Sequence, residues 1–127
     1  MDMEGLGKAN EARQLFLQAW NECSNDFERF IAAHYVARQT STLEDKLRWD
    51  ETALKAALKI DDDSVKTNYP SLYLNIGKGY EDLKDFENAK QYYQLAFSYT
   101  DYLPNDGYGR LIKSGIRNGI DRLSKEQ

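Results

Sequence analysis

The chain has 127 residues, of which 41% are hydrophobic and 30% are charged, and its formal net charge is −4. This length fits one domain with a real core, and the acidic balance argues against a nucleic-acid-binding protein, which usually presents a basic face. No apolar run approaches the roughly 20 residues of a membrane span, and the acidic N-terminus lacks the apolar segment of a secretory signal. The single cysteine, Cys23, suits a reducing compartment, so we expect a cytoplasmic protein.

The first half of the chain shows three amphipathic helical patterns. Residues 8–23 carry an apolar stripe at helical spacing, and the tripeptide SND that follows supplies N-cap chemistry for a helix over 27–37. A third helix is predicted over 43–60. Thr42 precedes it and Asp45 lies three residues further on, which is close to a capping box with aspartate in place of glutamate.

A run of three aspartates, DDDS at 61–64, interrupts this pattern. Carboxylate oxygens suit Ca²⁺ and Mg²⁺, so a metal site is one interpretation. The run lacks the glycine and the distal glutamate of an EF-hand loop. We therefore interpret it as a solvated acidic loop and predict no metal site.

The second half contains three more predicted helices. Pro70 suits the first turn of a helix over 70–83, and Asp85 is placed to cap a fifth helix that ends near Thr100. A sixth helix is predicted over 108–123. Its expected apolar side consists of Leu111, Ile112, Ile116 and Ile120. Because no segment shows strand-like alternation, the predicted fold class is all-α with about six helices.

The glycine pair in "GKG" (residues 77–79) raises the question of a phosphate-binding loop. Such a loop needs the spacing G-x-x-x-x-G-K-[ST] between a strand and a helix, and this segment has neither. The chain also has no dinucleotide, zinc-protease or serine-hydrolase motif. We therefore predict no cofactor.

Cys23 and the lone histidine, His34, are the residues from which a nucleophilic pair could be built. The sequence offers no third group to orient them. Packing is the simpler interpretation for both side chains, so we predict no catalytic residue and no enzyme.

The fourth and fifth helices carry a signature of small and aromatic residues at fixed spacing. It consists of Tyr73, Ile76, Gly77 and Tyr80 in one helix and Ala89, Tyr93 and Ala96 in the next. This spacing resembles the tetratricopeptide repeat over residues 70–101. In that resemblance Gly77, Ala89 and Ala96 allow close helix crossings, while Tyr73, Tyr80 and Tyr93 fill the space between helices.

Weaker copies flank the clear repeat. In the upstream copy His34 stands in the place of Gly77 and Ala53 in the place of Ala96, and in the downstream copy Gly115 takes the glycine place. The intervals between these positions exceed the roughly 34 residues of the standard repeat. The chain therefore resembles the longer-helix variety found in small bacterial-type members of the family.

The resemblance implies a single domain over residues 1–127, built as a short right-handed superhelix of stacked antiparallel helical hairpins. Its parts would be an N-terminal helix (8–23), a degenerate repeat (27–60), the clear repeat (70–101) and a capping helix (108–123). Only about two full repeats fit in this length, fewer than an array usually needs. A homodimer through the first or last helix is therefore one expectation.

The resemblance also implies a protein-binding scaffold, with a concave groove for a peptide or a partner protein. The residues carried over to that groove are Tyr35, Arg38, Asn75, Lys78 and Lys113. Asn75 and Lys113 match places where some family members hold a peptide's terminal carboxylate. Ile31 and Tyr35 stand where that clamp needs Lys and Asn, so the full clamp is absent. The alternatives are a regulator that senses a ligand or peptide and an accessory subunit of an enzyme.

Overall fold

The computed structural model describes residues 3–125, with side chains from residue 7, and this part of the chain contains helices and no strand. The all-α prediction is confirmed. The chain divides into two compact units, Met1–Ile60 (unit 1) and Asp61–Gln127 (unit 2), each described by itself. The predicted single domain and the superhelix stay predictions. The elements are α1 (Met3–Asn21), α2 (Asp26–Arg38), α3 (Leu43–Leu58), η1 (Asp63–Asn68), α4 (Tyr69–Asp82), α5 (Phe86–Ser98), η2 (Thr100–Tyr102) and α6 (Gly107–Lys125), where η marks a 3₁₀ helix.

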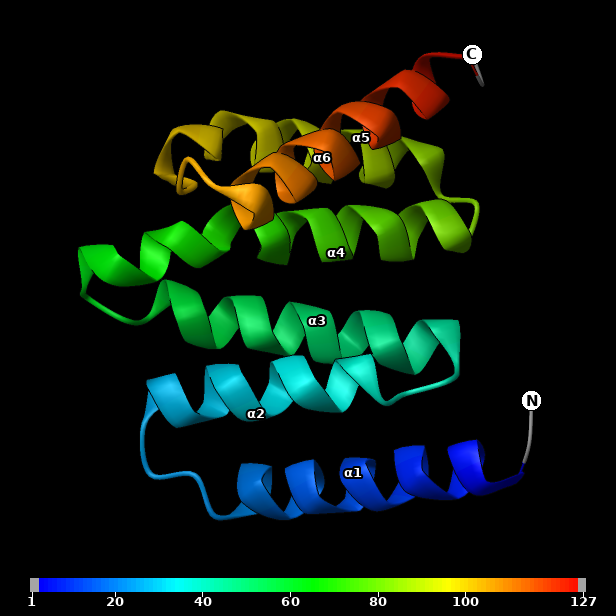
Figure 1. Cartoon of the computed structure of the whole chain (residues 1–127), viewed down its shortest axis with the longest axis vertical. Helices are drawn as coiled ribbons and strands as arrows, with labels where there is room; N and C mark the ends of the chain where they lie inside the picture. The colour runs from blue at the N-terminus through cyan, green and yellow to red at the C-terminus, as the bar shows by residue number, and fades with distance from the viewer. Residues whose placement is uncertain (1–2, 126–127) are drawn as a thin grey trace. The chain divides into compact units, whose positions relative to one another are not determined.

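Unit 1 is a sequence of three antiparallel helices, α1, α2 and α3 (Figure 1). Small side chains dominate its core, because alanines allow helix backbones to approach closely. The fully buried alanines are Ala33, Ala37, Ala53 and Ala57. Trp20 of α1 meets Trp49 of α3 edge-on with ring centroids 5.3 Å apart. This aromatic contact connects the first helix of the unit to the third.

The helix starts in unit 1 follow the predicted capping chemistry in one case and depart from it in the other. Asn25 caps α2, and its side chain accepts a hydrogen bond from the Glu28 N–H at 2.8 Å. The Thr42 side chain makes no capping bond to the backbone of α3. Its hydroxyl donates instead to the Asp45 carboxylate at 2.9 Å, so the expected capping box does not form. The helix also ends at Leu58, two residues earlier than predicted.

Unit 2 begins with η1 and continues into the antiparallel hairpin of α4 and α5 (Figure 1). Lys84 in the turn has φ of 67°, the left-handed conformation that reverses the chain. Asp85 accepts a hydrogen bond from the Asn88 N–H at 3.3 Å, which confirms it as the cap of α5. Pro70 lies in the first turn of α4, as predicted.

Helix α6 packs on both helices of this hairpin, and Tyr93 of α5 lies at the centre of the contact. A Cβ atom added at Gly77 of α4 would lie 2.9 Å from the Tyr93 ring, and one added at Gly119 of α6 would lie 2.6 Å from it. Real Cβ atoms are not found this close to ring carbons. Glycine at these two positions therefore makes room for a fully buried tyrosine.

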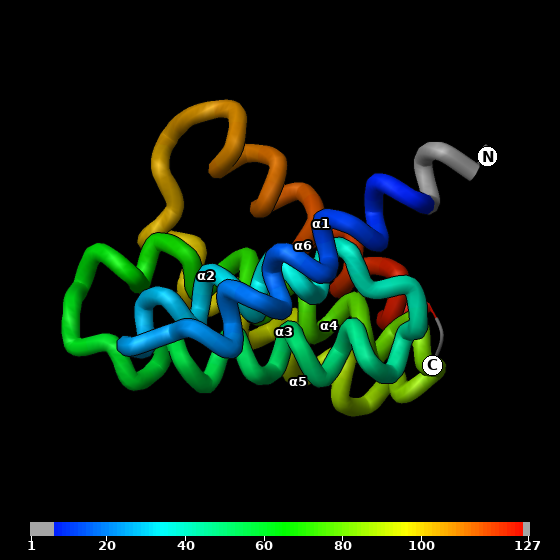
Figure 2. Tube along the Cα trace, turned by 90° about the horizontal axis from the view of Figure 1, so that it is seen from below, coloured from blue at the N-terminus to red at the C-terminus, as the bar shows by residue number. Residues whose placement is uncertain are grey.

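The connection between α5 and α6 is a wide loop, drawn in yellow to orange in Figure 2. Beyond it, Ile116 is buried and Ile112 and Ile120 are half-buried, but Leu111 is exposed. The prediction for Leu111 is therefore wrong, because it lies about 100° of helix rotation away from the Ile112–Ile116–Ile120 stripe. None of the described helices combines the length and apolar character needed to span a membrane.

Candidate functional site

An apolar hollow in unit 1 lies between α1 and α2, and we call it the α1–α2 pocket. Its volume is about 390 Å³. Six of its eight lining residues are apolar or weakly polar and two are glutamates. The lining consists of Phe16, Ala19, Glu22, Cys23, Phe27, Glu28, Ile31 and Ala32.

Aromatic contacts hold the side chains of this pocket in place. Phe16 of α1 stacks on Tyr35 of α2, with ring centroids 4.9 Å apart and planes 15° from parallel. Phe27 is 57% exposed and leans edge-on against the buried Phe30, with centroids 6.3 Å apart. The pocket thus presents an exposed phenyl ring on a fixed support, beside the predicted contact residue Tyr35.

Cys23 lines this pocket as a packing residue. Its thiol donates to the carbonyl of Ala19, four residues earlier in the chain, at 3.1 Å. Desolvation, and then the charge of Glu28, raise the pKa of the Cys23 thiol. A reactive cysteine needs the opposite shift, so the thiol is not prepared for nucleophilic attack.

His34 was predicted to take the small-residue place of a weaker upstream repeat copy, and that assignment stays a prediction. Its ring meets Tyr35 edge-on at 5.2 Å, and its Nδ1 is buried without a hydrogen-bond partner among the described residues. Burial, and then the nearby Arg38, lower the pKa of the imidazole. The side chain is therefore neutral at pH 7, and no hydrogen bond links it to Cys23 within the described structure.

The structure gives the predicted contact residue Arg38 an internal partner. Its guanidinium donates to the carboxylate of Asp50 on α3 at 2.5 Å, and that carboxylate is 2% exposed. Burial raises the pKa of Asp50 to about 6, although the charge of Arg38 acts in the opposite direction. Arg38 therefore neutralises a buried acid of unit 1, which leaves it less able to serve a ligand.

The three predicted contact residues of unit 2 come from α4 and α6. Lys78 is exposed and forms an ion pair with Asp82 one turn along α4, at 2.8 Å. Asn75 and Lys113 are half-buried. No hydrogen bond or ion pair joins Asn75, Lys78 and Lys113 in the described part of the chain. They remain a candidate polar face of unit 2, and Tyr35 and Arg38 belong to unit 1.

The seven signature positions of the repeat lie in and around the core of unit 2. Ala89, Tyr93 and Ala96 are fully buried, and Ile76 and Tyr73 are buried as well. Tyr80 stacks on Tyr92, with ring centroids 5.5 Å apart. Tyr73 belongs to the same row of tyrosines, because it lies 6.2 Å from Tyr92.

A cluster of three polar side chains in unit 2 was not anticipated from the sequence. Glu81 of α4 accepts from the Tyr93 hydroxyl at 2.6 Å and from Nε and Nη2 of Arg122, each at 2.9 Å. The bonds from Arg122, and then the one from Tyr93, lower the pKa of Glu81 to about 2. The same contacts raise the pKa of Arg122. Because 41 residues separate Glu81 from Arg122, no local spacing signals this cluster.

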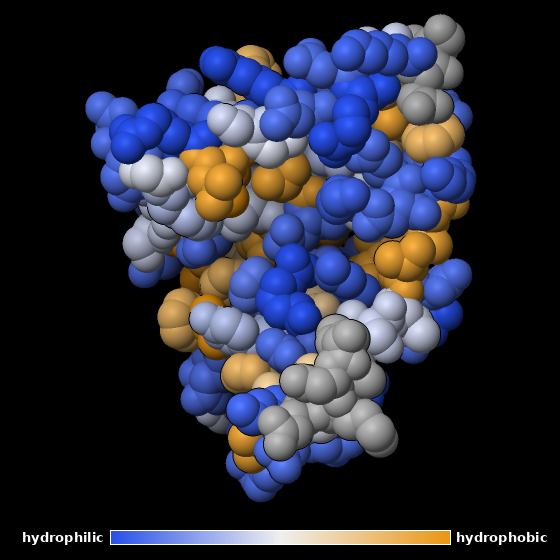
Figure 3. All heavy atoms as spheres, turned by 45° about the vertical axis from the view of Figure 1, so that its right-hand side comes forward, coloured by the Kyte–Doolittle hydropathy of each residue, from blue (hydrophilic) through white to orange (hydrophobic). Residues whose placement is uncertain are grey.

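The surface outside these features is mostly polar. On the face drawn in Figure 3, hydrophobic atoms form separate patches among hydrophilic ones. Within the described residues, no group of three or more His, Cys, Asp or Glu side chains is arranged to hold a metal ion.

Comparison with known protein families finds one match, which covers the hairpin of unit 2. Residues 70–101 match the family model described as the tetratricopeptide repeat. Comparisons with curated proteins and with solved structures gave no match. The matched segment contains α4 and α5, the helices that carry the signature positions and the glycine–tyrosine crossing. Together with the all-helical fold, this match supports a tetratricopeptide-repeat-like protein.

Proposed function

We propose that the protein is a non-catalytic interaction module that binds a peptide or a partner protein on its helical surface. The repeat family supports a protein-binding role in general. The observation that carries the proposal is the α1–α2 pocket, an apolar hollow with the exposed ring of Phe27 at its edge. Exposed aromatic side chains beside a preformed hollow are typical anchors of protein interfaces.

The chemistry of the pocket favours an apolar side chain of the partner. Burial of a phenyl-sized group there would contribute roughly 2 kcal/mol from the hydrophobic effect alone. Tyr35 adds an aromatic surface next to Phe16, and we propose it as a second contact. The carboxylates of Glu22 and Glu28 at the lining favour a partner that carries a positive charge beside its apolar anchor.

The remaining predicted residues form a second, weaker part of the proposal. Asn75, Lys78 and Lys113 would supply polar contacts from unit 2, and Arg38 would contribute only if its bond to Asp50 loosened. A cytoplasmic location, suggested by the single cysteine, completes the proposed setting.

The test is to select binding peptides from a displayed random library against the full chain and to compare two matched variants. Phe27→Ser removes the exposed ring of the pocket, and Phe97→Ser removes a ring of similar exposure, 51%, from α5 of the other unit. We expect Phe27→Ser to weaken selected peptides about tenfold or more. Phe97→Ser is expected to leave them within about twofold. Equal losses in both variants, or selected peptides indifferent to Phe27→Ser, would refute the pocket as the binding surface.

The polar face of unit 2 needs its own test. Lys78→Glu combined with Lys113→Glu reverses both charges, and Lys55→Glu with Lys59→Glu is the control on exposed lysines of unit 1. A peptide that uses the face loses affinity only in the first pair. A thermal shift with a small metabolite and none with any selected peptide would instead favour the sensing regulator.

A second copy of the chain is a competing occupant of the pocket. Size-exclusion chromatography with light scattering at tens of micromolar separates the cases. A dimer that Phe27→Ser converts to monomer would identify the occupant as another copy of α1–α2. A monomer in both forms excludes the homodimer and leaves the peptide proposal in place.

A further inference from the structure

A second hollow lies within unit 2, where η1 meets the connection between η2 and α6; we call it the tyrosine pocket. Its volume is about 360 Å³. Tyr102 and Tyr108 are 45% and 47% exposed, and Thr67, Asn68 and Pro104 complete the lining. Figure 1 shows both chain segments at the end of unit 2 where α4 begins. No residue of this pocket belongs to the surfaces proposed above.

The walls of the tyrosine pocket are held by backbone contacts. A Cβ atom at Gly109 would lie 1.8 Å from the Pro104 carbonyl oxygen, so the first turn of α6 closes directly onto that carbonyl. The Asp106 carboxylate accepts from the Gly109 N–H at 2.9 Å. Leu103 and Val65 are buried and anchor the two segments. A pocket formed in this way needs little ordering when a ligand binds.

The two segments around the pocket carry the net charge of the whole chain. Residues 61–68 and 99–108 contain five of the 21 acidic residues and one of the 17 basic residues, so sixteen of each remain elsewhere. All five aspartates are exposed. Among the described residues only Asp63 of the five has a basic partner within 4 Å, which is Lys66. This end of unit 2 therefore presents a negative field that would attract a basic ligand.

The protein already places one cation of its own against this surface. The Lys66 ammonium lies 5.8 Å from the centroid of the Tyr102 ring, within the range of a cation–π contact. Its bond to Asp63, and to a lesser extent the neighbouring Tyr102, raise the pKa of Lys66. The tyrosine rings and aspartates at this end of unit 2 thus stabilise a positive charge together.

We propose that the tyrosine pocket binds a basic peptide segment of a partner and holds an arginine side chain against Tyr102 and Tyr108. Arginine fits better than lysine because its flat guanidinium stacks on aromatic rings while its edges donate to carboxylates. A bound metal ion fits poorly, since the described carboxylates do not gather into a set of ligands. Aspartates spread over two segments instead suit a chain with several positive charges.

The proposal is tested by fluorescence anisotropy with the full chain and a labelled peptide of repeated Arg-Gly-Gly units. The comparison peptides replace arginine by lysine or by uncharged citrulline. We expect the arginine peptide to bind best, the lysine peptide more weakly and the citrulline peptide not at all. Tyr102→Leu, which keeps an apolar side chain, should weaken the arginine peptide about fivefold or more. Tyr108→Leu serves as the second ring variant if Tyr102→Leu unfolds in a circular dichroism melt.

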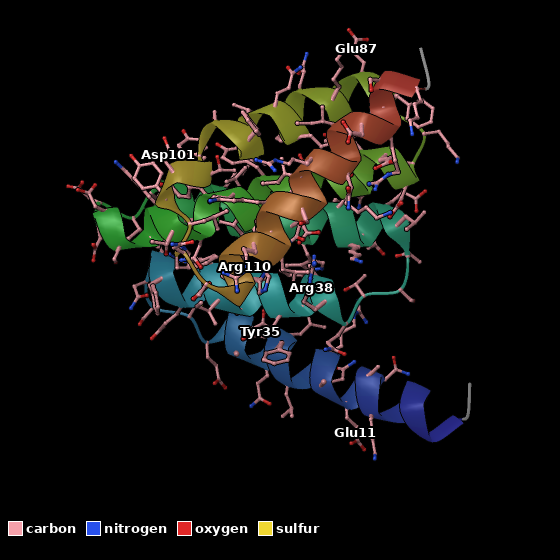
Figure 4. All side chains as sticks on the ribbon, turned by 45° about the horizontal axis from the view of Figure 1, so that its top comes forward. Glu11, Tyr35, Arg38, Glu87, Asp101 and Arg110 are labelled. Carbon is pink, nitrogen blue, oxygen red and sulfur yellow. The ribbon has the colours of Figure 1, made fainter. Side chains whose placement is uncertain are left out.

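The charge argument has a matched control within unit 2. Asp61→Asn with Asp101→Asn removes one exposed carboxylate from each of the two acidic segments (61–68 and 99–108), and Glu87→Gln with Asp121→Asn removes two exposed ones elsewhere. Figure 4 shows Asp101 and Glu87 at opposite ends of α5. The first pair should weaken the arginine peptide about tenfold and the second about twofold or less. Equal effects of the two pairs, no binding of the arginine peptide, or equal binding of an uncharged proline-rich peptide would each overturn the proposal.

The proposals for the α1–α2 pocket and for the tyrosine pocket can be refuted independently of each other. Phe27→Ser should leave the arginine peptide unaffected, because Phe27 belongs to the other unit. Loss of arginine-peptide binding in that variant would contradict an independent tyrosine pocket.

Discussion

Each unit of the molecule contains a carboxylate–arginine pair that joins two helices, and these two pairs behave in opposite ways. Asp50 in unit 1 is 2% exposed and receives a hydrogen bond from one arginine nitrogen, and its pKa is raised to about 6. Glu81 in unit 2 is 15% exposed and receives three hydrogen bonds, and its pKa is lowered to about 2. An arginine partner therefore does not by itself decide the sign of the shift. The balance between lost hydration and the number of donors decides it.

The two units can be followed separately in solution. Both tryptophans, Trp20 and Trp49, belong to unit 1, and eight of the nine tyrosines belong to unit 2. Tryptophan fluorescence therefore reports on unit 1, and tyrosine absorbance reports mainly on unit 2. Each variant below is assigned to its unit by which of the two signals moves.

The largest effect is expected when the buried acid loses its partner. Arg38→Met removes the guanidinium and leaves Asp50 alone in the core of unit 1, which should cost about 3–5 kcal/mol at pH 7. The loss should shrink at pH 5, where the carboxyl takes up a proton. Denaturant unfolding followed by tryptophan fluorescence measures both values. Arg48→Met, at an exposed arginine 3.7 Å from Asp45, is the control and should change stability by under about 0.5 kcal/mol. A loss at pH 5 as large as that at pH 7 would contradict the raised pKa.

The next largest effect is the pH dependence of stability that Asp50 causes. The pKa of Asp50 rises from 3.8 to about 6 on folding, so its stabilisation is complete below about pH 4 and is lost as pH rises through 6. Asp50→Asn should remove on the order of 2–3 kcal/mol of this pH dependence between pH 4 and pH 7. The lowered pKa of His34 acts the other way, because its contribution is lost as pH falls below 6.5. Tryptophan-detected unfolding across this range tests the prediction, with Asp45→Asn as control. An unchanged slope in Asp50→Asn would refute it.

A steric change in unit 2 should have a somewhat smaller effect. Gly119→Ala places a methyl group 2.6 Å from the Tyr93 ring, which is fully buried. We expect a loss of about 2 kcal/mol in the free energy of unfolding, seen by tyrosine absorbance. The control is Gly107→Ala in the same helix, where the nearest atom is the end of the Arg110 side chain at 3.9 Å. Equal stability of the two variants would contradict the close contact between Gly119 and the Tyr93 ring.

The smallest effect is expected at the Glu81 cluster. Glu81→Gln keeps the shape of the side chain but weakens its bonds to Arg122 and Tyr93, which should cost about 1–2 kcal/mol at pH 7. The stabilisation from Glu81 is present above pH 4.5 and is lost as pH falls toward 2, so the variant should lack this acid-dependent loss. Acid titration followed by tyrosine absorbance measures it. Asp82→Asn, next to Glu81 but paired with the exposed Lys78, is the control and should retain the wild-type profile.

Local features of the fold were predictable from single residues. Asp85 was recognised as a cap because a short carboxylate before an apolar run suits the free N–H groups of a helix start. Gly77 was recognised as a crossing residue because it stands in the glycine place of the repeat signature, and the structure places it against Tyr93. Leu111 was misplaced because neighbouring apolar residues on a helix point in directions about 100° apart, and only packing decides which of them is covered.

In the candidate sites too, some residues were predictable from the sequence, but their contacts were not. Tyr35 was predicted as an aromatic contact of a binding groove, and its stacking on Phe16 required the structure of α1 against α2. Arg38 was predicted to face a ligand, but its contact with Asp50 depends on how two helices pair across twelve residues of sequence. The tyrosine pocket was not anticipated, because the whole α4–α5 hairpin separates Thr67 from Tyr102 in the sequence.

The amino-acid sequence by itself determined the helical class, the order of the helices, most of their ends and the repeat over residues 70–101. These properties follow from periodicity and capping, which act over a few neighbouring residues. Only the tertiary structure decided that Asp50 and Glu81 have opposite pKa shifts, that Tyr93 lies against two glycines and that two tyrosines line one hollow. Burial and partner geometry set those properties, and both arise from residues that are distant in the chain.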